Sequence, residues 1–246
     1  MKIKFRKIYK KISSIVLLKS KKKVELEFWK EMVAEYTKWY KGGIESLFGE
    51  KNPEEKNKIY VNSIKDSAIL TWHKIHQEQK YLEDLVLKEN AFEGKKVLDI
   101  GSGPIPSATA FKNSDLYCLD PLLGDYINIG YPIHYYGQTK FICSHSENIP
   151  ISDNFFDAVI SVNAIDHVND LLKTSLEIKR VLKEGGTLRM HVHYHKKTQA
   201  EPIEINDEIM KEIFSWCKNF KKISESNSKR GYTLSKGGGI YTVWSN

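Results

Sequence analysis

Short apolar segments that alternate with helix-length connections constrain this chain more than any other feature. They begin at Lys95 and are rich in the branched and aromatic residues that strands favour. Parallel strands need long connections, because each crossover must return to the opposite end of the sheet. The segments expected to form such strands are 95–100, 116–120, 140–145, 155–163 and 186–195.

Two further segments near the C-terminus, 221–226 and 239–245, complete the expected sheet after helices over 170–184 and 206–219. Because only a short connection joins these last two segments, we expect them to be antiparallel. The pattern therefore predicts an α/β fold with a doubly wound, seven-stranded, mostly parallel sheet whose final strand is antiparallel.

The first third of the chain has a different pattern of apolar residues, which predicts an N-terminal helical extension. Apolar residues at helical spacing indicate one helix over 24–40 and a second near 62–88. We divide the chain into a tail over 1–23, a helical acceptor-binding or cap region over 24–92, and a main domain over 93–246.

The formal net charge of the whole chain is +7. Residues 1–23 carry ten basic side chains and no acid, so residues 24–246 have a net charge of −3. Apolar residues at helical spacing make this tail amphipathic, from Phe5 to Val16. Such a segment suits an anionic membrane surface, although a solvated basic helix fits the pattern equally well.

No apolar run is long enough for a membrane span, and three cysteines without a CxxC pair indicate reduced thiols. We therefore expect a cytoplasmic protein, with the inner membrane face as the alternative location for the tail.

The segment from Val97 to Gly103 (VLDIGSG) joins an apolar strand to a glycine turn. Glycines at this place let the backbone approach a ligand and turn into a helix. Asp120 ends the next strand about 20 residues later, where an acid can bind ribose hydroxyls. Pro106 stands at the third glycine of the dinucleotide pattern, and Pro104 removes a backbone donor, so we expect an adenosine-like ligand and no dinucleotide.

These motifs, in this order, resemble those of class I S-adenosylmethionine-dependent methyltransferases, which have a Rossmann-like fold. The resemblance rests on VLDIGSG, LDPL (119–122), SENIP (146–150), the fourth strand with its continuation to Val168, and EIKRVLKEGGTL (177–188). It implies S-adenosylmethionine as the cofactor. The cofactor-binding residues it implies are Asp99, Gly101, Ser102, Gly103, Asp120, Pro121, Leu122, His145, Ser146, Glu147 and Asn163. Which of His145, Ser146 and Glu147 meets the adenine stays open.

Methyl transfer to oxygen also needs a base near the donor methyl group. Asp166 and His167 directly follow the fourth strand, so we assign them as the catalytic pair, with His167 as the general base. A structural role for His167, such as capping a helix, is the alternative.

His191, His193 and His195 alternate along the fifth strand and should share one face. Three imidazoles in register are potential metal ligands, but neighbouring positions on one strand rarely give good geometry without carboxylates from elsewhere. We therefore expect no metal, and we assign His193 and His195 to the acceptor pocket.

Aromatic and polar side chains before the glycine motif suit a sugar or an aromatic acceptor, although a core position is the commoner role at helical spacing. The residues assigned to the acceptor from this region and from the loop 130–137 are Trp72, His76, Tyr81 and Tyr136. A fainter resemblance to bacterial methyltransferases of cell-surface polysaccharide synthesis favours a sugar O-methyltransferase. The alternatives are methylation of a phenol, amine or lipid, methylation of RNA, and a non-catalytic cofactor-binding scaffold. Because the body of the chain is acidic, we expect no nucleic-acid partner.

Overall fold

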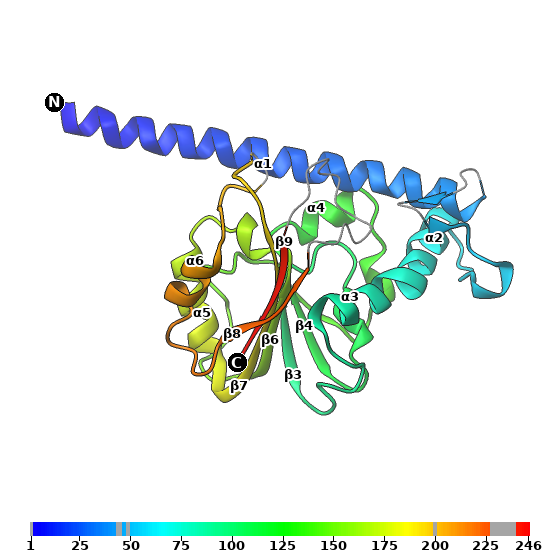
Figure 1. Cartoon of the computed structure of the whole chain (residues 1–246). Coiled ribbons are helices and arrows are strands. Elements are labelled where there is room, and N and C mark those ends of the chain that lie inside the picture. The colour runs from blue at the N-terminus through cyan, green and yellow to red at the C-terminus, as the bar shows by residue number, and fades with distance from the viewer. Residues whose placement is uncertain (1, 43–45, 48–49, 199–200, 227–239) are drawn as a thin grey trace.

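The computed structural model describes the backbone of residues 2–42, 46–47, 50–198, 201–226 and 240–246. Side chains are described over 21–42, 51–198, 201–226 and 240–246. A central sheet carries helices on its faces, and one long helix lies across the top of the body (Figure 1).

The sheet has seven strands in the order β5-β4-β3-β6-β7-β9-β8, which confirms the expected fold. The strands from β5 to β7 pair in parallel, while β9 is antiparallel to both of its neighbours. The strand bounds are β3 (Lys96–Ile100), β4 (Asp115–Leu119), β5 (Lys140–Ile142), β6 (Phe156–Val162), β7 (Leu182–Tyr194), β8 (Lys221–Ser226) and β9 (Ile240–Ser245).

The helices occupy the connections between strands, with two short strands in the N-terminal region. Asp170 and Asn206 accept hydrogen bonds from the first turns of α5 and α6, which fixes where both helices begin. The bounds are α1 (Lys2–Tyr40), β1 (Ser46–Leu47), β2 (Glu50–Lys51), α2 (Ile64–Trp72), a π turn (His73–Gln77), α3 (Glu78–Leu85), α4 (Leu123–Asn128), α5 (Leu171–Val181) and α6 (Asp207–Ile213). Short 3₁₀ turns lie at Glu55–Asn57, Ser107–Ala110, Ile133–Tyr135 and Ile165–His167.

The connection from β3 to β4 differs from the expectation of a helix after the glycine turn. It holds only the 3₁₀ turn Ser107–Ala110. Pro104 and Pro106 explain the difference, because neither can donate a backbone hydrogen bond and Pro106 adopts non-helical angles (φ −75°, ψ 74°). The third strand, at Lys140–Ile142, is also shorter than the expected 140–145.

Helix α1 runs without a break through the boundary drawn at residue 23, so the tail and the first expected helix are one element. Its N-terminal half extends beyond the body in Figure 1. The side chains of residues 1–20 lie outside the described residues, so membrane contact by the tail stays a prediction. Among the described residues, no helix combines the length and the apolar character needed to cross a membrane.

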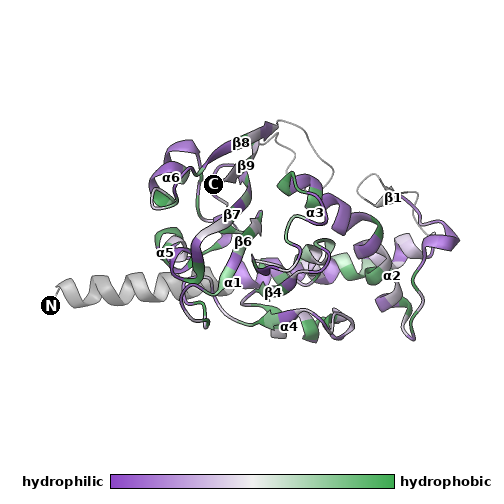
Figure 2. Ribbon diagram, turned by 90° about the horizontal axis from the view of Figure 1, so that it is seen from below, coloured by the Kyte–Doolittle hydropathy of each residue, from purple (hydrophilic) through white to green (hydrophobic). Residues whose placement is uncertain are grey.

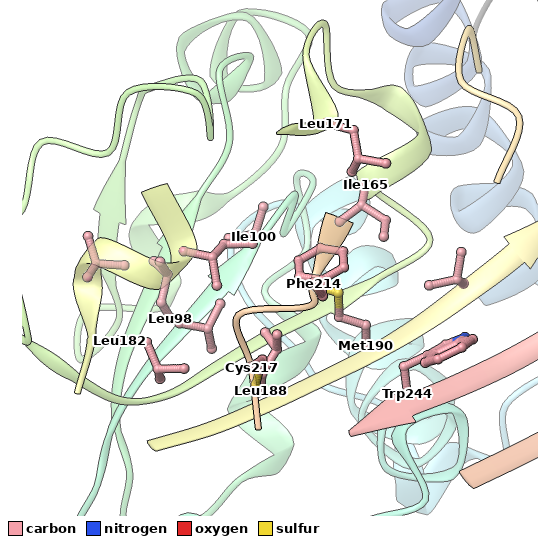
Figure 3. Close-up of a cluster of buried hydrophobic side chains, with 14 of the residues drawn as sticks. Leu98, Ile100, Ile165, Leu171, Leu182, Leu188, Met190, Phe214, Cys217 and Trp244 are labelled. Carbon is pink, nitrogen blue, oxygen red and sulfur yellow. The ribbon is translucent and has the colours of Figure 1, made fainter. Parts of the chain in front are cut away.

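The largest core cluster lies between the sheet and the helices α5 and α6 (Figure 3). Ile178 of α5, Phe214 after α6 and Trp244 of β9 are fully buried in it. Figure 2 shows hydrophilic and hydrophobic residues on both helices, as expected of helices that cover a sheet on one side only. This core holds the carboxyl ends of β3, β4 and β6 in fixed positions beneath α1.

Candidate active site

A cavity of about 590 Å³ opens at the carboxyl ends of β3, β4 and β6. Ligands bind at this edge in open α/β sheets, because the loops after neighbouring parallel strands converge there. Helix α1 forms the opposite wall, from Lys21 to Tyr36. The cavity is large enough for a small-molecule ligand together with a second, smaller one.

The glycine turn forms the floor of the cavity. Gly101 has a φ of +69° and Gly103 a φ of +63°, which side chains rarely allow. A Cβ atom on Gly101 would overlap that of Ala164, and one on Gly103 would lie 3.7 Å from the Trp29 ring. Gly101 is therefore required by the close approach of the loops after β3 and β6, whereas Gly103 is favoured by its left-handed backbone alone.

Asp120 lies on the cavity wall and ties two loops together. Its carboxylate accepts hydrogen bonds from the backbone N–H groups of Gly103 (3.0 Å) and Leu122 (2.8 Å). Burial raises the pKa of Asp120 to about 6, although both hydrogen bonds act against this shift. Ser102, Pro121 and Leu122 also line the cavity.

Asp99 is fully buried beneath the glycine turn, and it does not itself line the cavity. The Tyr81 hydroxyl donates a hydrogen bond to its Oδ1 atom, while its Oδ2 atom has no hydrogen-bond partner among the described residues. Burial raises the pKa of Asp99 to about 7. When ionised, the Asp99 carboxylate is a negative charge with only one hydrogen-bond donor among the described residues, and it lies behind the glycine turn. The resemblance assigns this turn to the amino-acid end of the cofactor.

The three residues assigned to the adenine end all line the cavity. Glu147 Oε1 accepts from the backbone N–H groups of Asn169 (2.6 Å) and Asp170 (3.0 Å), so it secures the loop before α5. Ser146 is buried and bonds Thr174 at 3.0 Å. His145 is exposed at the rim, which leaves it the most accessible of the three.

Asn163 follows β6 in a left-handed conformation (φ 49°), which asparagine tolerates better than most residues. Its Oδ1 atom lies 3.0 Å from His191 Nδ1, and it lines the cavity as expected. His167 also lines the cavity, with its ring nitrogens 3.9 Å from Glu25 and 3.7 Å from Asp166.

Asp166 is buried behind His167 and does not reach the cavity wall. Its Oδ2 atom lies 2.9 Å from His195 Nε2. Burial alone would raise the pKa of Asp166, but the hydrogen bond from His195 and the nearby His167 hold it below its usual value. The same contact raises the pKa of His195 to about 9.

Three residues before the glycine motif, Trp72, His76 and Tyr81, were assigned to the acceptor. Only one of them lines the cavity. Tyr81 lines the cavity, whereas Trp72 is fully buried against Tyr36 and Trp39 in the core between α1 and α2. The His76 ring packs against that same Trp72 ring, with 44° between the ring planes. These positions match the core alternative for aromatic residues at helical spacing.

The remaining residues assigned to the acceptor do not line the cavity. The Tyr136 ring packs edge-on against His73. His193 stacks on Tyr241, and His195 pairs with Asp166.

The sequence assigned residues 24–92 to acceptor binding or to a cap, but it did not predict that α1 forms a wall of the cavity. The Trp29 indole donates a hydrogen bond to Glu25 at 2.7 Å, and the Tyr131 hydroxyl donates to the Trp29 carbonyl at 2.9 Å. Lys21 lies on the same wall, and burial lowers its pKa. The helical periodicity of 24–40 was visible in the sequence, but nothing in it indicated which part of the body the helix would cover.

The residues present fit S-adenosylmethionine. Asp120 can accept from the ribose hydroxyls, the glycine turn leaves backbone exposed to the amino-acid end, and Asp99 supplies negative charge near the cationic groups.

Comparisons with known proteins find a methyltransferase-like segment in this chain. Residues 98–190 match the family model described as a methyltransferase domain. An uncharacterized protein of Methanocaldococcus jannaschii is 32% identical over 114 residues, which is 45% of this chain and 48% of that protein. A demethylmenaquinone methyltransferase of Renibacterium salmoninarum is 30% identical over 114 residues, covering 46% and 47%. The chain thus matches these curated relatives over only about half of their length.

Two solved structures share the fold. The YcgJ protein of Bacillus subtilis aligns with a TM-score of 0.54 at 17% identity, covering 69% of this chain and 97% of that one. A protein of Thermotoga maritima, titled a SAM-dependent methyltransferase and possible histamine N-methyltransferase, aligns with a TM-score of 0.52 at 18% identity, covering 71% and 91%. The sheet order and the glycine turn agree with a Rossmann-like fold, and residues 98–190 of this chain match a methyltransferase domain.

Proposed function

We propose that this protein uses S-adenosylmethionine to methylate a hydroxyl group of a small polar acceptor, in first place a sugar of a cell-surface glycan or of its precursor. The observation that carries the proposal is the composition of the α1 end of the cavity. On α1 the Trp29 ring lines the cavity together with Lys21 and Glu25, and Gln77 and Asp84 line it from the segment after α2.

Sugar sites combine an aromatic face for the apolar side of the ring with polar groups for its hydroxyls. Trp29 supplies the face, and its indole N–H already bonds Glu25, which holds that carboxylate beside the ring. Lys21 is more than half buried there, close enough to Glu25 and Glu147 for their charges to act on it. Both signs of charge are thus available to hydroxyl groups at this end.

When bound, the cofactor supplies a methyl group attached to a positively charged sulfur. Asp120 and the glycine turn orient the donor, while α1 closes the cavity on the acceptor side and limits the access of water. We assign His167 as the base that takes the hydroxyl proton. Glu25 and Asp166, within 4 Å of its two ring nitrogens, are placed to pair with the charge that the ring then gains.

The amphipathic residues 1–23 are proposed to lie on an anionic membrane surface. Helix α1 is continuous, so a tail held at the membrane would bring the cavity wall from Lys21 to Tyr36 close to lipid-linked acceptors.

A second candidate is an aromatic, membrane-soluble acceptor of the kind named for the demethylmenaquinone methyltransferase. It is favoured by the apolar side chains of Phe28, Met32 and Tyr36 on the same α1 wall. A quinol or phenol would bury its ring among them, whereas a sugar needs the polar groups near Trp29.

Radiolabelled methyl transfer from S-adenosylmethionine to a panel of nucleotide sugars, phenols and quinols distinguishes the two candidates. We expect transfer to a sugar, and transfer only to quinols or phenols would support the second candidate. With the acceptor found, His167→Gln should lower kcat by about 10²–10⁴-fold, the usual contribution of a general base. His134→Gln, which changes an exposed imidazole elsewhere, is the matched control. Unchanged kcat in His167→Gln would remove the base assignment.

We expect cofactor binding to weaken on acidification. Asp120, with a pKa of about 6, and Asp99, with a pKa of about 7, both lose their charge as the pH falls through these values. Between pH 8 and pH 5 the affinity for 5′-methylthioadenosine, which reports on the ribose alone, should fall by up to about tenfold. S-adenosylhomocysteine should lose more, because its ammonium group also feels Asp99.

Calorimetry across this pH range makes the comparison, and Asp120→Asn should remove most of the pH dependence for 5′-methylthioadenosine. Equal affinities at pH 5 and pH 8 for both ligands would show that neither carboxylate titrates as described.

A further inference from the structure

Five potential metal-binding side chains gather beyond the carboxyl ends of β6 and β7, beside the cavity. They come from three separate places: His193 and His195 from the end of β7, Glu201 from the segment before α6, and Asp166 and His167 from the turn after β6. One donor atom each from His193, His195 and Glu201 lies within 4.8 Å of the other two.

No metal was expected from the sequence, because His191, His193 and His195 on one strand need carboxylates from elsewhere to give good ligand geometry. The structure supplies those carboxylates. Glu201 Oε2 lies 3.6 Å from His195 Nδ1, and Asp166 Oδ2 lies 2.9 Å from the other nitrogen of the same ring. The ring centroids of His193 and His195 are 5.0 Å apart, so both imidazoles project to the same side of the strand.

His193 contains a second, independent indication of a ligand. Its side chain is buried, and its Nε2 atom has no hydrogen-bond partner among the described residues. Buried polar atoms are nearly always satisfied, so such an atom calls for an explanation. The His193 ring stacks on Tyr241 at 4.5 Å with an angle of 9° between the planes, which holds the imidazole in place.

We propose that His193, His195 and Glu201 bind one divalent transition-metal ion, of which Zn²⁺ fits best, and that Asp166 orients His195 from outside the ligand set. Two imidazoles and one carboxylate suit Zn²⁺ and similar ions, whereas Mg²⁺ prefers oxygen ligands. A carboxylate on the second ring nitrogen of a histidine ligand is the usual way in which proteins fix that ring.

Binding requires only local change. Ligand bonds of about 2.0–2.2 Å place donor atoms roughly 3.3 Å apart in a tetrahedral site, so side-chain rotation suffices to close the set. His195 Nδ1 now faces the Lys196 carbonyl at 2.7 Å and would turn to the ion, releasing its proton to solvent. Three protein ligands leave a coordination position for water or for an oxygen of the acceptor. Glu201 also lies 4.0 Å from His167, so the ion would stand at the acceptor end of the cavity.

The test is calorimetric titration of chelator-treated full-length protein with ZnCl₂. Cys143 is an exposed thiol two residues from His145, so every protein in the series carries Cys143→Ser. We expect one equivalent of Zn²⁺ to bind, and MgCl₂ not to compete. Glu201→Gln and His193→Ala should each weaken binding by at least about tenfold, because each removes a ligand. His134→Ala, which changes an exposed imidazole elsewhere, should bind as the parent does.

Co²⁺ gives a second readout that does not depend on activity. Its visible absorption bands should appear with one equivalent and be lost in Glu201→Gln. Binding of S-adenosylhomocysteine by each variant shows that the domain is folded. If His193→Ala does not fold, the metal affinity of Glu201→Gln, which changes a partly exposed residue, tests the proposal by itself. No Zn²⁺ binding below millimolar concentration, or equal binding by the parent and Glu201→Gln, would overturn the proposal.

Discussion

Asp120→Ala is expected to lower the affinity for S-adenosylhomocysteine by about 10²–10⁴-fold. The carboxylate can accept from two ribose hydroxyls, and hydrogen bonds to a charged group contribute about 1.5–3 kcal/mol each. The same atoms hold the backbone N–H groups of Gly103 and Leu122, so the substitution also releases both loops from each other. Calorimetry at pH 8, where the carboxylate is ionised, measures the loss.

Asp153→Ala is the matched control, because it removes a carboxylate at an exposed position, where it pairs with Arg180. Its affinity should equal that of the unmodified protein, since surface ion pairs contribute little. Asp120→Asn should fall between the two, because the amide keeps one acceptor oxygen. Wild-type affinity in Asp120→Ala would remove Asp120 from the cofactor site.

Gly101→Ala is expected to reduce the free energy of unfolding by about 2–5 kcal/mol, the sum of a left-handed backbone cost and an overpacking cost. The new Cβ atom would lie well inside the van der Waals distance of Ala164 Cβ, which is attached directly to the backbone and cannot rotate away. Because the glycine turn would shift, cofactor affinity should fall as well. Denaturant unfolding and calorimetry measure the two effects.

Gly94→Ala separates the two costs, because Gly94 has a similar φ of +70° but nothing within 4 Å of the added Cβ atom. It should lose only about 1–2 kcal/mol, the backbone cost alone. Adding Ala164→Gly to Gly101→Ala should recover the difference. If the two alanine variants were equally stable, the close approach of the loops after β3 and β6 would not be the reason for Gly101.

The strands and the order of the site loops could be predicted from sequence, because local pattern and spacing decide them. An apolar strand followed by Gly101 and Gly103, with Asp120 ending the next strand, specifies which loops meet at one edge of the sheet. The places of Asn163 and of residues 145–147 could be predicted from the same order of motifs. All of these residues line the cavity.

Features that depend on tertiary packing could not be predicted in this way. Periodicity showed that residues 24–40 form a helix, but it did not show which side chains of that helix face the cavity, so Glu25 was not identified. Trp72 has the same aromatic character as Trp29, yet it is buried between helices. Glu201 lies in a segment without regular structure, and its approach to His195 results from the path of the chain after β7.

The expected helix after the glycine turn was wrong for a local reason that the sequence already contained. Pro104 and Pro106 interrupt the first turn, and only the 3₁₀ turn Ser107–Ala110 forms. The same two prolines that disfavour a dinucleotide also disfavour a helix at this place.

A crystal structure with S-adenosylhomocysteine bound tests most directly the claim that the cavity beneath α1 is the methyl-donor site. The ribose hydroxyls should lie within hydrogen-bond distance of Asp120, the amino-acid end should lie against Gly101–Gly103, and the sulfur should face the side of the cavity that carries His167. Binding at any other place, or no binding at millimolar ligand and pH 8, would contradict the account.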